Sequence, residues 1–374
     1  MMADKEHQHI ENDEAYKGLN VNRGIEQPEI FDENSIQRFL KNKKKHKLTV
    51  DDYVNGIREG NRTILSKAVT LVESSKVEHQ QIAQQIIMKC LSYSGKSIRI
   101  GITGVPGVGK STFIESTGKY ITSLGHKLAV LAIDPSSERS KGSILGDKTR
   151  MEELSVDPNA YIRPSPSAGS LGGVARKTRE TIILCEAAGF DVIFIETVGV
   201  GQSETVVHSM VDFFLLLMLS GAGDELQGIK RGIMEMADAI TINKADGDNV
   251  DRANMARVQY MNALHLFPPT DSGWKPKVLT CSAYKKIGID QIWQTINDYL
   301  SHVNQTGFFQ FKRNEQAKFW MYETINDQLK SNFYQNQKIK ELLGTFEGKV
   351  LGEELSSFVA AKDLLDTYYQ SQKV

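Results

Sequence analysis

The sequence predicts an α/β fold with a doubly wound, mostly parallel sheet between residues 97 and 303. Short apolar segments rich in β-branched residues recur there with little alternation, as expected for strands buried on both faces. The segments between them, such as Ser111–Leu124 and Gly173–Ala188, are long enough for crossover helices. A glycine-rich turn follows the first apolar segment. The expected strands are Ile98–Thr103, Leu128–Ile133, Asp191–Glu196, Val211–Leu219, Ala239–Asn243 and Val278–Ser282.

The composition fits a globular protein of two or three domains. The chain has 374 residues, of which 40% are hydrophobic and 24% are charged. With 45 Lys and Arg against 46 Asp and Glu, the net charge of −1 gives no global attraction to nucleic acid or to an anionic membrane. We therefore expect neither as a partner.

Cysteine usage and hydropathy favour a cytoplasmic protein. The three cysteines are far apart in the sequence, and no Cys-x-x-Cys or Cys/His cluster is present. The longest apolar run, Phe213–Leu219, is too short to span a bilayer. The N-terminal segment 1–20 is polar and acidic, unlike a secretory signal or a transit peptide.

The first part of the chain is expected to contain an arm and a small helical unit. Residues 1–46 are predicted to form a disordered or extended arm, whose terminal basic run is better explained as a solvated face than as a nucleic-acid patch. Residues 47–96 are predicted to be helical. Apolar residues share one helical face at Leu65, Ala68, Val69 and Val72, and again at Ile82, Ile86, Ile87 and Cys90.

The last part of the chain, residues 304–374, is predicted to be a helical extension. The apolar residues at helical spacing are Phe319, Tyr322, Ile325, Leu329 and Phe333. Their aromatic content indicates that they are buried, either on the chain's own domain or on a second copy of the chain.

The strongest local signal is the glycine-rich turn, which matches G-x-x-x-x-G-K-[ST] at every fixed position. Glycines let successive N–H groups turn toward a phosphate, and the following helix points its positive end at the same anion. Lys110 adds a full charge near the β and γ phosphates. The candidate nucleotide-binding residues here are Gly104, Val105, Pro106, Gly107, Val108, Gly109, Lys110, Ser111 and Thr112.

A second motif predicts that the base is guanine. Asn243, Lys244 and Asp246 form N-K-x-D at the end of an expected strand. The Asp246 carboxylate can accept hydrogen bonds from N1–H and the exocyclic amine of guanine, whereas adenine would leave it unpaired. A later strand ends in Cys281-Ser282-Ala283, where the Ala283 N–H can meet guanine O6, and Ser282, Ala283 and Tyr284 are further candidate nucleotide-binding residues. We therefore expect GTP or GDP as the bound nucleotide.

Acidic residues at strand ends are candidates for a magnesium site. Mg²⁺ prefers oxygen ligands, usually one or two carboxylates together with phosphates and waters. Ser111, Asp134, Asp147 and Glu196 are the candidate metal ligands. Asp147 can also order the attacking water, so Lys110, Asp147 and Glu196 are the candidate catalytic residues.

Three glycine-rich or polar segments are candidate switches that respond to the γ-phosphate: 136–150, 199–204 and 220–230. Their candidate switch residues are Gly199, Gln202, Asp224, Glu225, Gln227 and Lys230. Small GTPases carry D-x-x-G followed by Gln, but here Gln202 lies three residues beyond Gly199. We therefore expect slow intrinsic hydrolysis of GTP that a partner or dimerisation accelerates.

Together these motifs resemble those of the MeaB/ArgK-type G proteins, over about residues 50–370. The segments that carry the resemblance are 104–111, 134–137, 146–151, 196–204, 223–230 and 243–246. The resemblance implies a P-loop GTPase domain at 97–303 and a C-terminal dimerisation extension at 304–374. It also implies a homodimer that gates adenosylcobalamin loading and protects or reactivates an acyl-CoA mutase of the methylmalonyl-CoA type.

Two alternative functions belong to the same P-loop class. A GTPase that inserts a metal would need His or Cys clusters, which the sequence lacks. A small-molecule kinase would transfer phosphate to an acceptor, and the guanine-selecting motif argues against it.

Overall fold

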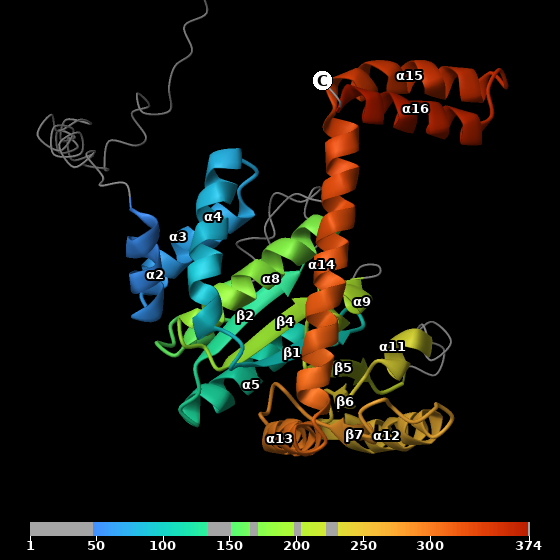
Figure 1. Cartoon of the computed structure of the whole chain (residues 1–374). Helices are drawn as coiled ribbons and strands as arrows, with labels where there is room; N and C mark the ends of the chain where they lie inside the picture. The colour runs from blue at the N-terminus through green and yellow to red at the C-terminus, as the bar shows by residue number, and fades with distance from the viewer. Residues whose placement is uncertain (1–47, 134–150, 165–170, 198–202, 222–230, 373–374) are drawn as a thin grey trace, which may run out of the picture. The chain divides into compact units, whose positions relative to one another are not determined.

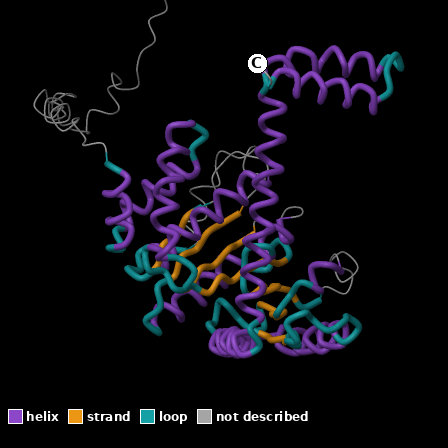
Figure 2. The backbone as a smooth tube through the Cα atoms, in the orientation of Figure 1, coloured by secondary structure: helices purple, strands orange, loops and turns teal. Residues whose placement is uncertain are grey.

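The computed structural model describes residues 48–133, 151–164, 171–197, 203–221 and 231–372. The predicted parallel sheet is confirmed. Seven strands, all paired in parallel, lie in the order β3-β2-β4-β1-β5-β6-β7 (Figures 1 and 2). Their bounds are β1 Ile98–Gly104, β2 Leu128–Ile133, β3 Ala160–Arg163, β4 Val192–Thr197, β5 Phe213–Leu219, β6 Ala239–Asn243 and β7 Lys277–Thr280.

The strands are apolar throughout because helices cover both faces of the sheet. In β5, Phe213, Leu215 and Leu217 pack toward α5 (Lys110–Ser123) and α13 (Ile289–Gln305). The alternate residues of β5 join the core on the opposite face, to which α8 (Leu171–Ala187) and α12 (Val250–Leu264) also contribute side chains. Burying each such side chain stabilises the fold by about 1.5–3 kcal/mol.

β1 ends one residue later than predicted and β4 is shifted by one residue, and three strands differ further. β3 was not predicted, because four residues are too few to show a pattern. β5 begins at Phe213 rather than Val211, since the preceding Asp212 side chain accepts a hydrogen bond from the Arg99 backbone at 2.8 Å. β7 ends at Thr280 rather than Ser282, because Ser282 leaves the sheet and bridges to Ile287.

The described residues before β1 form the α-helices α2 (Val50–Arg58), α3 (Arg62–Glu73) and α4 (Val77–Cys90). The α2 helix starts with a capping box in which Thr49 and Asp52 satisfy each other's backbone N–H groups. The apolar faces expected from the sequence are buried, except that Ile82 is half-buried, and α3 and α4 pack on α8. The expected arm, residues 1–46, lies outside the described residues.

The region after α13 is helical as predicted, with α14 (Phe308–Gln335), α15 (Gln337–Leu351) and α16 (Ser357–Ser371) (Figure 1). Four of the five apolar residues expected to be buried, Phe319, Tyr322, Ile325 and Leu329, are exposed in the single chain. The chain's own domain therefore does not bury this stripe. The reason is that α14 uses other side chains for its contacts with the domain. None of the described helices combines the length and apolar character needed to span a membrane.

The first half of α14 is fastened to the segment between residues 209 and 212, just before β5. Arg313 donates to both carboxylate oxygens of Asp212, at 2.8 and 2.6 Å, and to the backbone oxygen of Ser97 at 2.7 Å. Further along α14, Gln316 donates to the backbone oxygen of Val211, and the Trp320 indole donates to that of Ser209. These contacts, together with the packing of Phe308, Phe309 and Trp320 against the two cores, hold α14 on the domain.

We predict that Arg313→Ala lowers the free energy of unfolding by about 3–5 kcal/mol, because it leaves the Asp212 carboxylate buried without its cation. Denaturant titration of the full chain measures this. Lys318→Ala, which removes an exposed ion pair with Glu315 on the same helix, serves as the matched control and leaves the midpoint unchanged. Equal midpoints for the two variants would contradict the anchoring role of Arg313.

Candidate nucleotide-binding site

The glycine-rich turn lies between the end of β1 at Gly104 and the start of α5 at Lys110. A Cβ added at Gly104 would lie 2.4 Å from the Leu217 backbone oxygen of β5, so a side chain cannot be accommodated there. Gly107 and Gly109 have φ values of +76° and +89°, a backbone region that favours glycine. The turn thus has the backbone of a phosphate-binding loop that opens onto a helix N-terminus.

Lys110 is held across this loop. Its ammonium group donates to the backbone oxygens of Gly104 and Val105, at 3.0 and 3.4 Å. Burial lowers the pKa of Lys110, while the nearby carboxylates of Glu196 and Glu204 act in the opposite direction. A partly buried cation beside the loop is the group that a phosphate would pair with.

Glu196 lies at the end of β4, the neighbour of β1, and is buried. The adjacent Thr197 hydroxyl donates to that of Thr103 on β1 at 2.8 Å, which ties the two strand ends together. Ser111 is half-buried in the first turn of α5, whereas Thr112 is exposed. A hydroxyl and a carboxylate near Lys110 suit the oxygen preference of Mg²⁺. The other candidate ligands, Asp134 and Asp147, lie outside the described residues.

The second motif meets the phosphate loop directly. The Asn243 amide, at the end of β6, donates to the Val108 backbone oxygen at 2.8 Å. Lys244 donates through its ammonium group to the Gly107 backbone oxygen at 2.9 Å. The two motifs, far apart in the sequence, therefore form one continuous site at the carboxyl ends of the strands.

The loop after β7 completes the base side of the site. The Asp246 carboxylate accepts a hydrogen bond from the Ser282 hydroxyl. The Ala283 backbone N–H donates to the Asn243 side-chain oxygen at 3.1 Å. Tyr284 is exposed, with the Lys285 ammonium 5.3 Å from its ring centroid. The candidate base-binding residues are thus brought together, and Tyr284 is the one that points away to solvent.

Two residues of this region were not predicted from the sequence. The Asn249 amide donates to the Lys244 backbone oxygen at 2.7 Å, and its oxygen accepts from the Ser220 hydroxyl at 2.6 Å. Ser116 on α5 donates to the Ala283 backbone oxygen at 2.6 Å. No sequence pattern signals either contact, because the partners of Ser220 and Ser116 are distant in the chain.

The candidate switch residues Gly199, Gln202, Asp224, Glu225, Gln227 and Lys230 lie outside the described residues. The elements that flank them are described. β4 ends at Thr197 and α9 (Ser203–His208) follows, while β5 leads to Gly221 and α11 (Arg231–Glu235) follows. β4 and β5 therefore end at the carboxyl edge of the sheet, on which the phosphate loop also lies.

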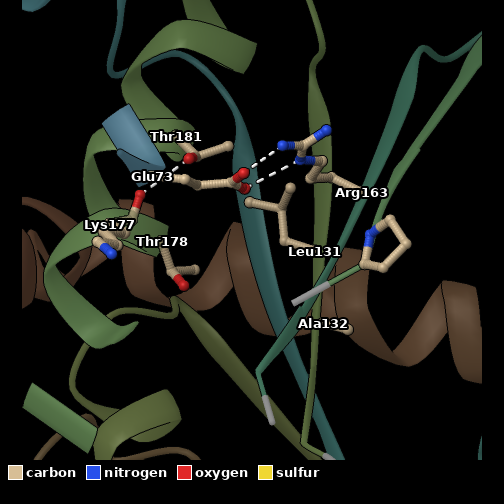
Figure 3. A pocket seen from close by; sticks show the side chains of 8 residues that line it. Glu73, Leu131, Ala132, Arg163, Lys177, Thr178 and Thr181 are labelled. Carbon is tan, nitrogen blue, oxygen red and sulfur yellow. Dashed lines mark hydrogen bonds and ion pairs between the residues drawn. The ribbon is translucent and has the colours of Figure 1, made fainter. Parts of the chain in front are cut away.

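A small hollow at the ends of β2 and β3 contains a half-buried ion pair rather than a ligand site (Figure 3). Arg163 of β3 donates to both carboxylate oxygens of Glu73 at the end of α3, one at 2.9 Å. The hollow measures about 10 Å³, room for about one water molecule. Its role is structural, since the pair joins the helices before β1 to the sheet.

Comparisons with known proteins agree with this site. The family described as methylmalonyl-CoA mutase-associated GTPase MeaB matches residues 65–338. A probable GTPase of Mycobacterium tuberculosis is 47% identical over 318 residues, which cover 85% of this chain and 95% of that protein. The methylmalonic aciduria type A homolog of Mus musculus, a mitochondrial protein, is 46% identical over 329 residues, 85% of this chain and 79% of that one.

A solved structure supports the same assignment. The crystal structure titled LAO/AO transport system kinase is 37% identical to this chain, with a TM-score of 0.69 over 86% of this chain and 98% of that one. The phosphate loop, the base-binding loops and the whole sheet lie within the residues that the family matches. The resemblance seen in the sequence is confirmed: the chain is a P-loop GTPase and belongs to the family of methylmalonyl-CoA mutase-associated GTPases, MeaB.

Proposed function

We propose that this GTPase gates the loading of adenosylcobalamin into an acyl-CoA mutase of the methylmalonyl-CoA type, and protects or reactivates that mutase. The observation that carries the proposal is the direct contact between the phosphate loop and the N-K-x-D motif, which makes one site for a whole guanine nucleotide. The name of the matching family and that of the mouse relative supply the link to the mutase.

Within this proposal each residue has a chemical role. The loop N–H groups and Lys110 hold the β and γ phosphates, and Asp246 and the Ala283 N–H recognise guanine. Ser111 and Glu196, with Asp134 and Asp147, would hold Mg²⁺, which would neutralise charge on the phosphates. Asp147 would order the attacking water. We expect the intrinsic rate to be slow because Gln202 is displaced from the position that follows Gly199 in small GTPases.

The switch role is proposed for segments 199–204 and 220–230. Loops of this kind are ordered by a γ-phosphate and released on hydrolysis. The contact of Asn249 with both Ser220 and the Lys244 backbone supports a link between the second segment and the base side of the site. A cytoplasmic location stays a prediction from the sequence.

We also propose that the chain forms a homodimer through its C-terminal helices. Along α14, Phe319, Tyr322, Ile325 and Leu329 are between 46% and 60% exposed at a spacing that places them along one side of the helix. Four large apolar side chains exposed along one side of a helix mark an interaction surface. A second copy is the occupant that we favour, because the same apolar stripe on each chain would be self-complementary about a two-fold axis.

Lys110→Ala is expected to weaken binding of GTP and GDP and to lower turnover at least about 100-fold, because the charge on the phosphates loses its cation. Release of inorganic phosphate from GTP measures turnover, and calorimetry measures affinity. Lys89→Ala, which breaks an exposed ion pair on α4, is the matched control and retains both. Normal turnover in the Lys110 variant would exclude this loop as the phosphate site.

The dimer is tested by light scattering of the full chain. Wild type should have twice the chain mass of 41.8 kDa, and Leu329→Asp should shift it to the monomer because a charge would be buried in the interface. Gln310→Asp places the same charge on an exposed polar position of α14 and should stay dimeric. A monomeric wild type at micromolar concentration would refute the proposal.

The client is tested with purified adenosylcobalamin-dependent methylmalonyl-CoA mutase. We expect its affinity for the full chain to differ at least about 10-fold between the GDP form and a form loaded with a non-hydrolysable GTP analogue. Lys110→Ala should abolish this difference. Equal affinity in both nucleotide states, or no binding in either, would contradict a gating role.

A further inference from the structure

Ser116 makes an unusual contact for a hydroxyl in the middle of a helix. Thr178 and Thr295, both within helices, donate to the carbonyl four residues earlier. Ser116 instead donates across the domain, to the Ala283 backbone oxygen at 2.6 Å, and the serine is buried. Its partner belongs to the loop after β7, 167 residues further along the chain. Burial protects this hydrogen bond from competition with water.

The Ala283 residue is therefore held at both of its backbone polar groups. Its carbonyl accepts from Ser116 on α5, and its N–H donates to the Asn243 side-chain oxygen at 3.1 Å. The amide nitrogen of Asn243 in turn donates to the Val108 backbone oxygen in the phosphate loop. Because the phosphate loop continues directly into α5, the contacts form a closed ring through both halves of the site.

The other edge of the base side has separate supports. Asp246 accepts from the Ser282 hydroxyl, and the Ser282 oxygen accepts from the Lys285 backbone N–H at 3.0 Å. Neither of these contacts involves Ser116. The orientation of the Ala283 N–H and the orientation of the Asp246 carboxylate are thus fixed by different groups.

We propose that Ser116 is a positioning residue for guanine recognition. By holding the Ala283 carbonyl it fixes the backbone at Ala283, so that the Ala283 N–H, which donates to Asn243, can be shared with O6 of the base. The proposal rests on the proposed guanine site and deepens it. Ser116 also links the two subsites, since α5 carries the phosphate-binding Lys110 at its first turn. Removing the hydroxyl would leave the Ala283 carbonyl with only the longer hydrogen bond from the Lys286 backbone N–H, at 3.3 Å, and would loosen the loop at Ala283.

The test compares nucleotides that differ at one edge of the base. 6-Thio-GTP replaces O6 by sulfur, a weak hydrogen-bond acceptor, and ITP lacks the exocyclic amine that Asp246 would bind. Affinities are measured on the full chain by competition against a fluorescent GDP. In Ser116→Ala, the preference for GTP over 6-thio-GTP should fall about 10-fold, whereas the preference for GTP over ITP should stay unchanged.

Three further variants make the result specific. Asp246→Asn should show the opposite pattern, with a reduced preference for GTP over ITP. Ser123→Ala removes an exposed hydroxyl of the same helix, which bonds within its own turn, and should match wild type. Ser116→Cys keeps the volume with a weaker donor and should give an intermediate preference. If Ser116→Ala has a lowered melting temperature, the nucleotide preferences of Ser116→Cys are compared with those of wild type instead.

Two results would overturn the inference. One is a Ser116→Ala variant that loses affinity for GTP, 6-thio-GTP and ITP equally, which would make the serine a general structural residue. The other is an unchanged preference for GTP over 6-thio-GTP in both Ser116 variants. A wild-type chain that does not prefer GTP to ATP would instead refute the guanine site itself, and the inference with it.

Discussion

The site depends on the hydrogen bonds that join the end of β6 to the phosphate loop. Asn243 and Lys244 donate to the carbonyls of Val108 and Gly107, so that these carbonyls point away from the anion side of the loop. Carbonyl oxygens that pointed into the loop would repel the negatively charged phosphate, whereas backbone N–H groups attract it. The fixed distance between β1 and β6, with β5 between them, sets how far the base side lies from the phosphate side.

The buried sheet supplies that fixed distance. Both faces of β5 are covered, and β1 and β6 pair with it on either side, so the strand ends cannot shift independently. Gly104 allows β1 to reach the Leu217 backbone without a clash. The side chains of the two nucleotide-binding motifs therefore keep fixed positions, because the sheet beneath them is close-packed.

The helical extension is connected to the same scaffold at the opposite end of β5. Arg313 and Trp320 of α14 donate hydrogen bonds to the segment from Ser209 to Asp212, which joins α9 to β5. α9 begins at Ser203, within the candidate switch segment 199–204, and the segment that follows α9 is the one that α14 contacts. The exposed stripe of α14 begins at Phe319, next to the anchoring Trp320, and continues to Leu329.

Much of the site could be predicted from the sequence because its chemistry resides in local motifs. The phosphate loop needs glycines at particular turns and a lysine at a helix start, and these constraints act between neighbouring residues. The central strands were equally predictable, since burial on both faces demands uninterrupted apolar residues. Short β3 was missed because four residues carry too little pattern, and β7 was predicted too long because Ser282 bonds outside the sheet.

The sequence by itself determined the α/β class, the nucleotide-binding motifs and the helices on either side of the sheet domain. Each of these follows from local backbone conformation and from the spacing of apolar residues. Only the tertiary structure decided which distant groups meet. Ser116 and Ala283, Asn249 and Ser220, and Arg313 and Asp212 are paired by the packing of whole elements. The tertiary structure also decided that the α14 stripe is exposed in the single chain. The physical reason is that hydrogen-bond partners are chosen by three-dimensional proximity, on which the local pattern of a single sequence places no constraint.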